Sequence, residues 1–500
     1  MNGSKHVRKI VIVGGGTAGW MTAVTFARHL GDDYDIQLIE SEEIGIVGVG
    51  EASIPGIRRF NDNLGITEAD FLGKTQGTFK LGIQFEGWGK PDQSYFHSFG
   101  EMGSPNGIIP FYQYWLRHAH TGNMQDLWDV SAGARAALQD RFGKTNTAFG
   151  ESANDFNYAY HFDSHLYGKF LRRVAQINGV KRVEGKIVDV ALNAENGFID
   201  SVIMEDSTSI AADLFIDCSG FAALLIGKAL GSEYEDWSNY LPCNRALAVP
   251  SKSTGALKPY TKSTARAAGW QWRIPLQHRT GNGHVYCSDF ISDDEATQTL
   301  LDGLDGEALA EPRQIKFVTG KRKQFWRKNC IAIGLAGGFM EPLESTSIHL
   351  VQTAIMRLLN LFPTKEFHQS DIDKFNSESD VEFSAIRDFL ILHYHVNQRE
   401  GMPFWDRCRE MTIPDTLTDK IALFKSNGRI IPDLYDLFAQ SSWLQVMLGQ
   451  GLFPQSHHPL ADQMSAAATK AYIQAELDKA QIAVRQLPLH SEYISKLLAG

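Results

Sequence analysis

The feature that most constrains the fold is the segment at residues 8–40, which has the pattern of a βαβ unit. Its first part, RKIVIV, is a short run rich in β-branched residues, and it leads directly into Gly14-x-Gly16-x-x-Gly19. The next part, TAGWMTAVTFARHL, has the apolar spacing of a helix, and YDIQLIES predicts a second strand. Since the first strand is apolar without polar alternation, we expect a parallel strand that is covered on both faces. The chain is therefore predicted to be an α/β protein.

The glycines of this unit are spaced as in a dinucleotide-binding turn. Gly14 allows the tight turn, Gly16 lets the backbone approach a pyrophosphate, and Gly19 lets the helix pack closely. The N-terminus of the helix then directs backbone N–H groups at the phosphates. Glu40 ends the second strand, where a carboxylate accepts hydrogen bonds from a ribose. A purely structural glycine turn is the alternative, but the flanking strands, helix and acid favour nucleotide binding.

Later segments favour FAD as the nucleotide. The acid at the strand end disfavours the 2′-phosphate of NADP and leaves FAD or NAD. A second strand and glycine turn, IAIGLAGG at 331–338, and the strand ADLFIDCSG at 212–220 are typical of an FAD site. Only one dinucleotide fingerprint is present in the sequence, so we expect reduced flavin to come from a separate reductase.

Composition excludes several classes of partner. Lys and Arg number 48 against 58 Asp and Glu, a net charge of −10, which argues against nucleic acid and acidic membrane surfaces. The five cysteines are scattered without a CxxC pair, so we expect reduced thiols in a cytoplasmic protein. The sequence contains no apolar run long enough for a membrane span, and its N-terminal apolar run does not resemble a signal peptide. We expect an α/β module at 1–370 and a mainly helical module at 371–500.

A tryptophan-rich hexad, Trp270-x-Trp272-x-Ile274-Pro275, is the most specific of the remaining patterns. One interpretation is an edge strand with aromatic residues on one face, ended by proline. The other is a bulky wall beside a cofactor. Because indole supplies no acid–base group, neither interpretation makes these residues catalysts.

Metal and hydrolase sites lack support in the sequence. His161 and His165 are four residues apart, as zinc ligands on a helix are, but a third ligand and a general-base Glu beside them are missing. We therefore expect no metal. The sequence also has no Gly-x-Ser-x-Gly elbow and no P-loop, so hydrolase and NTPase functions are not predicted.

Taken together, the motifs resemble those of the flavin-dependent halogenases in the tryptophan halogenase family. The resemblance implies a Rossmann-like FAD-binding domain of the GR2 type, followed by a largely helical C-terminal module that covers the substrate. It also implies a separate flavin reductase as partner, and a homodimer. The segments that carry the resemblance are GGGTAGW at 14–20, VGVGEASIP at 47–55, HSFG at 97–100, HFDSHL at 161–166, the hexad at 270–275 and EPLESTS at 341–347.

The resemblance implies two catalytic residues. In the family, reduced FAD, oxygen and chloride or bromide give hypohalous acid, which reaches an active-site lysine. Lys80 lies at the matching position and would hydrogen-bond this acid or become a haloamine. Glu344 would polarise the electrophile and help to accept the proton that the aromatic ring loses. The structural alternatives are a solvated or salt-bridged lysine and an acid stabilised at a helix N-terminus.

The resemblance also assigns halide and FAD contacts. Thr346 and Ser347 lie at a turn that opens a helix and would offer backbone N–H groups to the halide. The family usually has glycine where this chain has Ser347. Beyond the glycine turn, the positions that the family uses to contact FAD are Thr17, Ala18, Ile187, Leu335 and Ile348.

The substrate is predicted to be an indole-type aromatic. His97 and Phe99 match positions that clamp an indole ring in the family. The enzymes that act on free tryptophan carry a tyrosine pair where this chain has Trp443 and Leu444. This difference favours indole, a substituted indole or a phenol over free tryptophan. The alternatives are a halogenase of free tryptophan, an FAD-dependent aromatic hydroxylase and an inactive flavin-binding protein.

Overall fold

The computed structural model describes residues 5–43, 50–122, 126–144 and 157–500. Residues 47–49 of the VGVGEASIP match therefore lie outside the described residues. Two compact units alternate along the chain: the first comprises Met1–Gly77, Phe162–Asn244 and Lys316–Ser384, and the second comprises Thr78–His161, Arg245–Ile315 and Ala385–Gly500. Helix α9 (Gln369–His395) contributes residues to both units. A module boundary near residue 370 stays a prediction.

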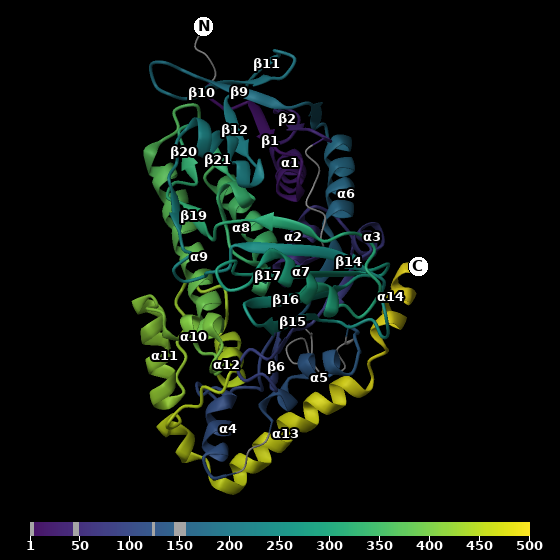
Figure 1. Cartoon of the computed structure of the whole chain (residues 1–500), viewed down its shortest axis with the longest axis vertical. Helices are drawn as coiled ribbons and strands as arrows, with labels where there is room; N and C mark the ends of the chain where they lie inside the picture. The colour runs from purple at the N-terminus through teal and green to yellow at the C-terminus, as the bar shows by residue number, and fades with distance from the viewer. Residues whose placement is uncertain (1–4, 44–49, 123–125, 145–156) are drawn as a thin grey trace. The chain divides into compact units, whose positions relative to one another are not determined.

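The first unit is built on a six-stranded sheet that contains the predicted βαβ unit (Figure 1). β1 (Lys9–Val13) lies between β12 (Leu214–Asp217) and β2 (Asp35–Glu40), and both neighbours run parallel to it. Four of its five residues are buried, so the prediction of a covered parallel strand is confirmed. The sheet is completed by β20 (Trp326–Arg327), β21 (Cys330–Ala332) and β8 (Lys181–Glu184).

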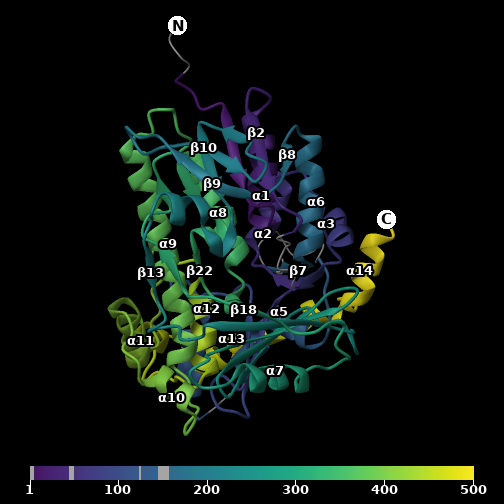
Figure 2. The ribbon, with the colours of Figure 1, turned by 45° about the horizontal axis from the view of Figure 1, so that its top comes forward.

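Helix α1 (Thr17–Leu30) follows the glycine turn and is the centre of the helical packing in this unit. α6 (Ser164–Ile177) and α8 (Ser347–Asn360) both pack against it, and Figure 2 shows α1 beside α6. The other elements that begin in this unit are β3 (Gly50–Ala52), α2 (Gly56–Asn63), α3 (Glu68–Thr75), β9 (Ile187–Leu192), β10 (Ile199–Met204), β11 (Ser209–Ala211), β13 (Tyr234–Asp236), β19 (Gly320–Arg322) and β22 (Gly338–Phe339).

The second unit contains a seven-stranded sheet in the order β18-β14-β17-β16-β15-β5-β6. β16 (Gly269–Pro275), which carries the tryptophan hexad, lies between β15 (Thr261–Arg266) and β17 (Thr280–Tyr286) and is antiparallel to both. The edge-strand interpretation of the hexad is therefore wrong, because β16 is paired on both sides. The other strands are β5 (Gly82–Glu86), β6 (Ser94–Ser98), β14 (Arg245–Ser251) and β18 (Arg313–Lys316).

Helices dominate the chain from residue 369 onward, as predicted. In the second unit α13 (Ala466–Arg485) packs against α4 (Phe111–Ala119) and α5 (Ala132–Leu138), which can be followed in Figure 1, and α12 (Gln440–Gly449) packs against β6. The remaining α-helices of this unit are α7 (Asp293–Asp302), α10 (Pro403–Glu410), α11 (Asp415–Asn427) and α14 (His490–Leu498).

The cysteines and the helices bear on two predictions made from composition. All five cysteines are buried and free, which confirms the prediction of unpaired thiols. Within the described ranges, none of the helices combines the length and the apolar character needed to cross a membrane.

Candidate functional site

The glycine turn of the first unit is tight at two of its glycines and open at the third. A Cβ on Gly14 would lie 2.2 Å from the carbonyl oxygen of Cys218, and a Cβ on Gly19 would lie 1.9 Å from the carbonyl oxygen of Gly14. Gly14 also has a φ of 115°, which only glycine adopts readily. At Gly16, by contrast, no heavy atom lies within 4 Å of the Cβ position. The open space over Gly16, at the start of α1, suits a pyrophosphate held by helix N–H groups.

Glu40 lies directly against this turn, at the end of β2. A Cβ on Gly15 would lie 1.7 Å from Glu40 Oε2. The Nε1–H of Trp20 donates a hydrogen bond to that oxygen at 3.3 Å, while Arg172 and Arg182 donate to Oε1. The glutamate side chain is 11 % exposed. These donors fix the carboxylate beside the turn, which is the position of an acid that binds a ribose.

The second glycine turn lies against the first. Gly334 has a φ of 74°, and a Cβ there would lie 2.8 Å from the Cβ of Ala18. Leu335 belongs to the same short turn, which packs against α8, and Ile348 lies in the first turn of that helix. The structure thus brings most of the predicted FAD contacts to the N-terminal end of α1. Ile187 begins β9 in the same unit.

Two valine substitutions in the first turn are expected to have opposite effects. Gly14→Val places a side chain against the Cys218 carbonyl at a residue with positive φ. We therefore expect the free energy of unfolding to fall by about 2–4 kcal/mol, or the protein to become insoluble. Gly16→Val fills open space, so we expect near-normal unfolding but a Kd for FAD raised about 10- to 100-fold. Thermal melts and FAD titration measure the two effects. Unaltered FAD affinity in Gly16→Val would contradict the assignment.

Glu344 and the predicted halide residues form one turn in the first unit, in which Glu344 and Thr346 are buried and Ser347 is half-buried. Glu344 ends a short 3₁₀ turn and is 2 % exposed. Ser345 follows with a φ of 61°, a left-handed conformation that leads the chain into α8. Thr346 is the N-cap residue of α8 and Ser347 is its first residue. The predicted turn that opens a helix is confirmed, and its backbone N–H groups lie at the positive end of the helix dipole.

Lys80 lies in the second unit, at the end of β4 (Thr78–Lys80), which pairs antiparallel with β7 (Ala159–Asp163). Its side chain is 0 % exposed, so the alternative of a solvated lysine is excluded. The Nζ atom lies 5.3 Å from the centre of the Phe99 ring, and the Phe99 N–H donates a hydrogen bond to the Leu81 carbonyl. An ammonium shielded from bulk water in this way interacts strongly with a polar reactant.

His97 belongs to a group of aromatic side chains that includes two residues not predicted from the sequence. The His97 ring centre lies 5.8 Å from that of Phe389 and 6.3 Å from that of Phe438. The two phenylalanines stack at 3.9 Å, and Trp443 packs edge-on against Phe389 at 5.0 Å. We call these four residues the aromatic group; all are buried. It connects two predicted substrate residues, His97 and Trp443.

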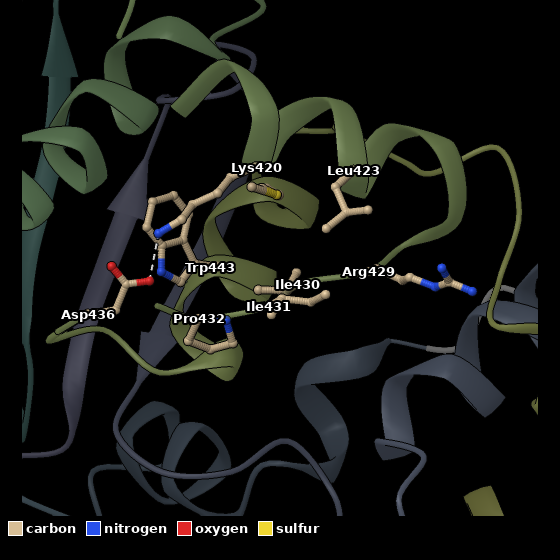
Figure 3. Close-up of a pocket in the computed structure, with 9 residues that line it drawn as sticks. Lys420, Leu423, Arg429, Ile430, Ile431, Pro432, Asp436 and Trp443 are labelled. Carbon is tan, nitrogen blue, oxygen red and sulfur yellow. Dashed lines mark hydrogen bonds and ion pairs between the residues drawn. The ribbon is translucent and has the colours of Figure 1, made fainter. Parts of the chain in front are cut away.

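A pocket of the second unit opens beside Trp443 (Figure 3). The Nζ atom of Lys420 lies 4.7 Å from the centre of the Trp443 ring and forms ion pairs with Asp433 at 2.9 Å and Asp436 at 2.6 Å. The Nε1–H of Trp443 has no hydrogen-bond partner among the described residues. The rest of the lining is mostly apolar and comprises Leu423, Arg429, Ile430, Ile431, Pro432 and Met447.

The two tryptophans of the hexad are both buried in the second unit. Trp270 packs against Trp88, with ring centres 6.3 Å apart. Trp272 lies across the neighbouring strand β17, because a Cβ on Gly283 would lie 2.0 Å from its ring. The glycine therefore makes room for the indole in a strand that otherwise has no space for it.

The end of the hexad is tied to the strand that carries Lys80. Ile274 is buried, and Pro275 is the last residue of β16. The Pro275 carbonyl accepts a hydrogen bond from the Thr78 hydroxyl at 2.8 Å. The hexad and β4 are thereby joined within the second unit.

The two histidines considered as metal ligands lie in different elements. His161 is in strand β7, and His165 is in the first turn of helix α6. They are therefore not a pair on one helix face. Across the described ranges, no cluster of three or more His, Cys, Asp or Glu side chains could hold a metal ion.

Comparison with known proteins shows one family along almost the whole chain. Residues 9–466 match the tryptophan halogenase family. The chain is similar to Xcc4156, a flavin-dependent halogenase from Xanthomonas campestris, with 45 % identity, a TM-score of 0.95 and 98 % coverage of each chain. BrvH, a flavin-dependent halogenase from Brevundimonas sp. BAL3, is 42 % identical with a TM-score of 0.95, over 98 % of this chain and 100 % of that one. Tryptophan 6-halogenase SttH of Streptomyces toxytricini is 34 % identical over 99 % of both chains.

These similarities agree with the glycine turns and the α/β fold with its helical C-terminal region. They imply FAD, a halide ion and O2 as the reactants, and they do not support the alternative of an aromatic hydroxylase. The family relies on a flavin reductase and takes an aromatic substrate. The chain therefore belongs to the tryptophan halogenase family and is an FADH2-dependent halogenase.

Proposed function

We propose that this enzyme halogenates an indole-type aromatic rather than free tryptophan. The observation that carries the proposal is the pair Trp443 and Leu444 in α12, at 1 % and 0 % exposure. A tyrosine hydroxyl donates and accepts hydrogen bonds, so it can bind either charged end of an amino acid. An indole N–H only donates, and leucine does neither. Neither side chain can accept a hydrogen bond from a substrate ammonium.

The charges beside Trp443 also disfavour an amino acid. Lys420 is ion-paired with Asp433 and Asp436, and the Asp436 side chain is 4 % exposed. A substrate carboxylate would compete with these aspartates for Lys420, and a substrate ammonium would compete with Lys420 for them. Asp433 is 71 % exposed, so the cost falls mainly on the buried Asp436: leaving one partner of a buried ion pair uncompensated costs about 3–5 kcal/mol. An uncharged indole avoids that cost, and Trp443 lines the pocket with an aromatic ring that an indole can pack against.

The residues of the first unit would hold FAD and the halide. When bound, reduced FAD supplies hypohalous acid from O2 and the halide. The backbone N–H groups of Thr346 and Ser347 would hold the halide at the start of α8. The side chains and glycines that would hold FAD are Gly14, Gly16, Thr17, Ala18, Gly19, Glu40, Ile187, Leu335 and Ile348.

Lys80 and Glu344 would act on the reacting atoms. The Lys80 ammonium donates a hydrogen bond to the oxygen of hypohalous acid, which leaves the halogen electrophilic towards the ring. The Glu344 carboxylate stabilises the positive charge on the arene and accepts the proton that it loses. Lys80 belongs to the second unit and Glu344 to the first, so their joint action is part of the proposal.

The remaining predicted residues would shape the substrate site. His97 and Phe99 would contact the aromatic ring of the substrate. The hexad residues Trp270, Trp272, Ile274 and Pro275 would form an inert wall that keeps the substrate from the flavin while the smaller hypohalous acid passes.

The proposal is tested with a panel of single substrates supplied with FAD, a flavin reductase, O2 and either bromide or chloride. Indole, substituted indoles, phenol and free tryptophan are compared by mass spectrometry, in which the halogen isotope pattern identifies the product. We expect halogenated indoles to form at least about tenfold faster than halotryptophan, a difference of about 1.4 kcal/mol in transition-state binding. Faster turnover of free tryptophan would contradict the proposal.

A further inference from the structure

Two buried histidines contact the strand that carries Lys80, and neither has a role in the proposed chemistry. His161 lies on β7 directly opposite Thr78 of β4. Its Nδ1 atom lies 3.0 Å from Thr78 Oγ1, and its Nε2 atom lies 2.9 Å from Thr261 Oγ1. Both ring nitrogens therefore have a hydroxyl partner, and all three residues belong to the second unit.

The hydrogen-bond partners fix the direction of this chain of contacts. The Thr78 hydroxyl has a single proton, and it donates that proton to the Pro275 carbonyl at 2.8 Å, since a carbonyl can only accept. Thr78 Oγ1 must then accept from His161, so Nδ1 carries the imidazole proton. In the neutral ring the Nε2 atom of His161 is then bare and accepts from the Thr261 hydroxyl. One neutral tautomer satisfies every partner.

The second histidine is held in the same way on another side of the strand. The Nε2 atom of His490 accepts from the backbone N–H of Phe79 at 3.1 Å, and its Nδ1–H donates to the Leu257 carbonyl at 3.0 Å. Burial lowers the pKa of His490 to about 4. Burial, Lys80 and His490, in that order, lower the pKa of His161 well below its usual value. Neither imidazole therefore adds positive charge next to Lys80.

We propose that His161 is a positioning residue for Lys80. Its Nδ1–H donates to Thr78, which lies two residues before Lys80 on the same face of β4, and its Nε2 joins Thr78 to Thr261 of β15. Because the Thr78 oxygen accepts from His161, the Thr78 hydroxyl proton stays directed at the Pro275 carbonyl at the end of the hexad. The ammonium then meets hypohalous acid in a single orientation. This inference rests on the proposed role of Lys80.

Two substitutions separate the two hydrogen bonds of His161. The amide of His161→Asn can replace Nδ1 and keep the bond to Thr78, whereas the amide of His161→Gln can replace Nε2 and keep the bond to Thr261. We expect His161→Gln to lower kcat for halogenated indole about 10- to 100-fold with little change in KM, and to release free hypohalous acid instead. We expect His161→Asn to lose less than about fivefold. Thr78→Val should show the same loss of kcat as His161→Gln. Thr261→Val should show the same smaller loss as His161→Asn.

A second measurement does not depend on turnover. With ¹⁵N-labelled histidine, the His161 resonances, assigned by their loss in His161→Gln, should show one protonated and one bare ring nitrogen at neutral pH. If folded His161→Gln and Thr78→Val convert hypohalous acid into halogenated indole as completely as the wild type does, the proposed role of His161 is wrong. A doubly protonated His161 ring would also overturn it. If Lys80→Met halogenates normally, the proposed role of Lys80 fails instead, while the nitrogen resonances still report the tautomer of His161.

Discussion

Replacing Lys80 with alanine is expected to lower halogenated product by about a thousandfold while hypohalous acid is still formed. The reason is that Lys80 is fully buried and would donate the hydrogen bond that directs the electrophile at the ring. The measurement is twofold: halogenated indole by mass spectrometry, and free hypohalous acid by a trapping reagent. The residues proposed to bind FAD belong to the other unit, so we expect FAD affinity to stay unchanged.

Matched variants separate loss of the ammonium from loss of packing. Lys80→Met keeps the length of the side chain without the charge and should be as inactive as Lys80→Ala. Lys252→Ala removes a lysine that is 61 % exposed and pairs with the exposed Glu307, and it should leave turnover unchanged. If Lys80→Ala also abolished hypohalous acid, Lys80 would act before the halogen-transfer step, contrary to the proposal.

Replacing Glu344 with glutamine is expected to lower kcat about a hundredfold with FAD affinity retained. The substitution keeps the shape of a side chain that is 2 % exposed but removes the group that would accept the ring proton. Steady-state kinetics with indole and FAD titration measure the two effects.

Glu341 provides the matched control, because it is buried three residues earlier in the same turn. Glu341→Gln should change mainly the melting temperature, while kcat per FAD-loaded molecule should change little. Equal loss of kcat in both variants would show that the turn needs its buried charge and that Glu344 has no individual role.

The local motifs of the chain could be predicted because they depend on neighbouring residues. The strand, glycine turn and helix at residues 8–40 were predicted from spacing, and the structure explains Gly14 and Gly19 by close backbone approaches, such as the 2.2 Å between a Cβ on Gly14 and the Cys218 carbonyl oxygen. The turn before α8 was likewise predicted from EPLESTS. In both places the sequence determines the backbone within a few residues.

Features that depend on distant segments were missed or misassigned. Phe389 and Phe438 stack at 3.9 Å although 49 residues separate them, and nothing in either local sequence indicates this pairing. The edge strand was one of two interpretations of the hexad, and it was open because the alternation of the residues does not reveal how many neighbouring strands pair with it. Gly283, on which the ring of Trp272 lies, was the available signal for an interior strand.

The histidine spacing was also ambiguous in the sequence. A spacing of four residues from His161 to His165 fits one helix face, but Asp163 accepts hydrogen bonds from N–H groups in the first turn of α6, so the helix begins after His161. His161 remains in β7, where it contacts Thr78. A cap residue inside the motif was the sequence signal that separates the two histidines.

The choice between indole and free tryptophan is tested most directly by competition. Equimolar indole and tryptophan are supplied to one enzyme sample with FAD, a flavin reductase, O2 and bromide, and the initial ratio of the two brominated products gives the ratio of their kcat/KM values. Because Trp443 and Leu444 provide no acceptor for an ammonium, we expect bromoindole to exceed bromotryptophan by at least about tenfold. An excess of bromotryptophan would contradict the proposed function.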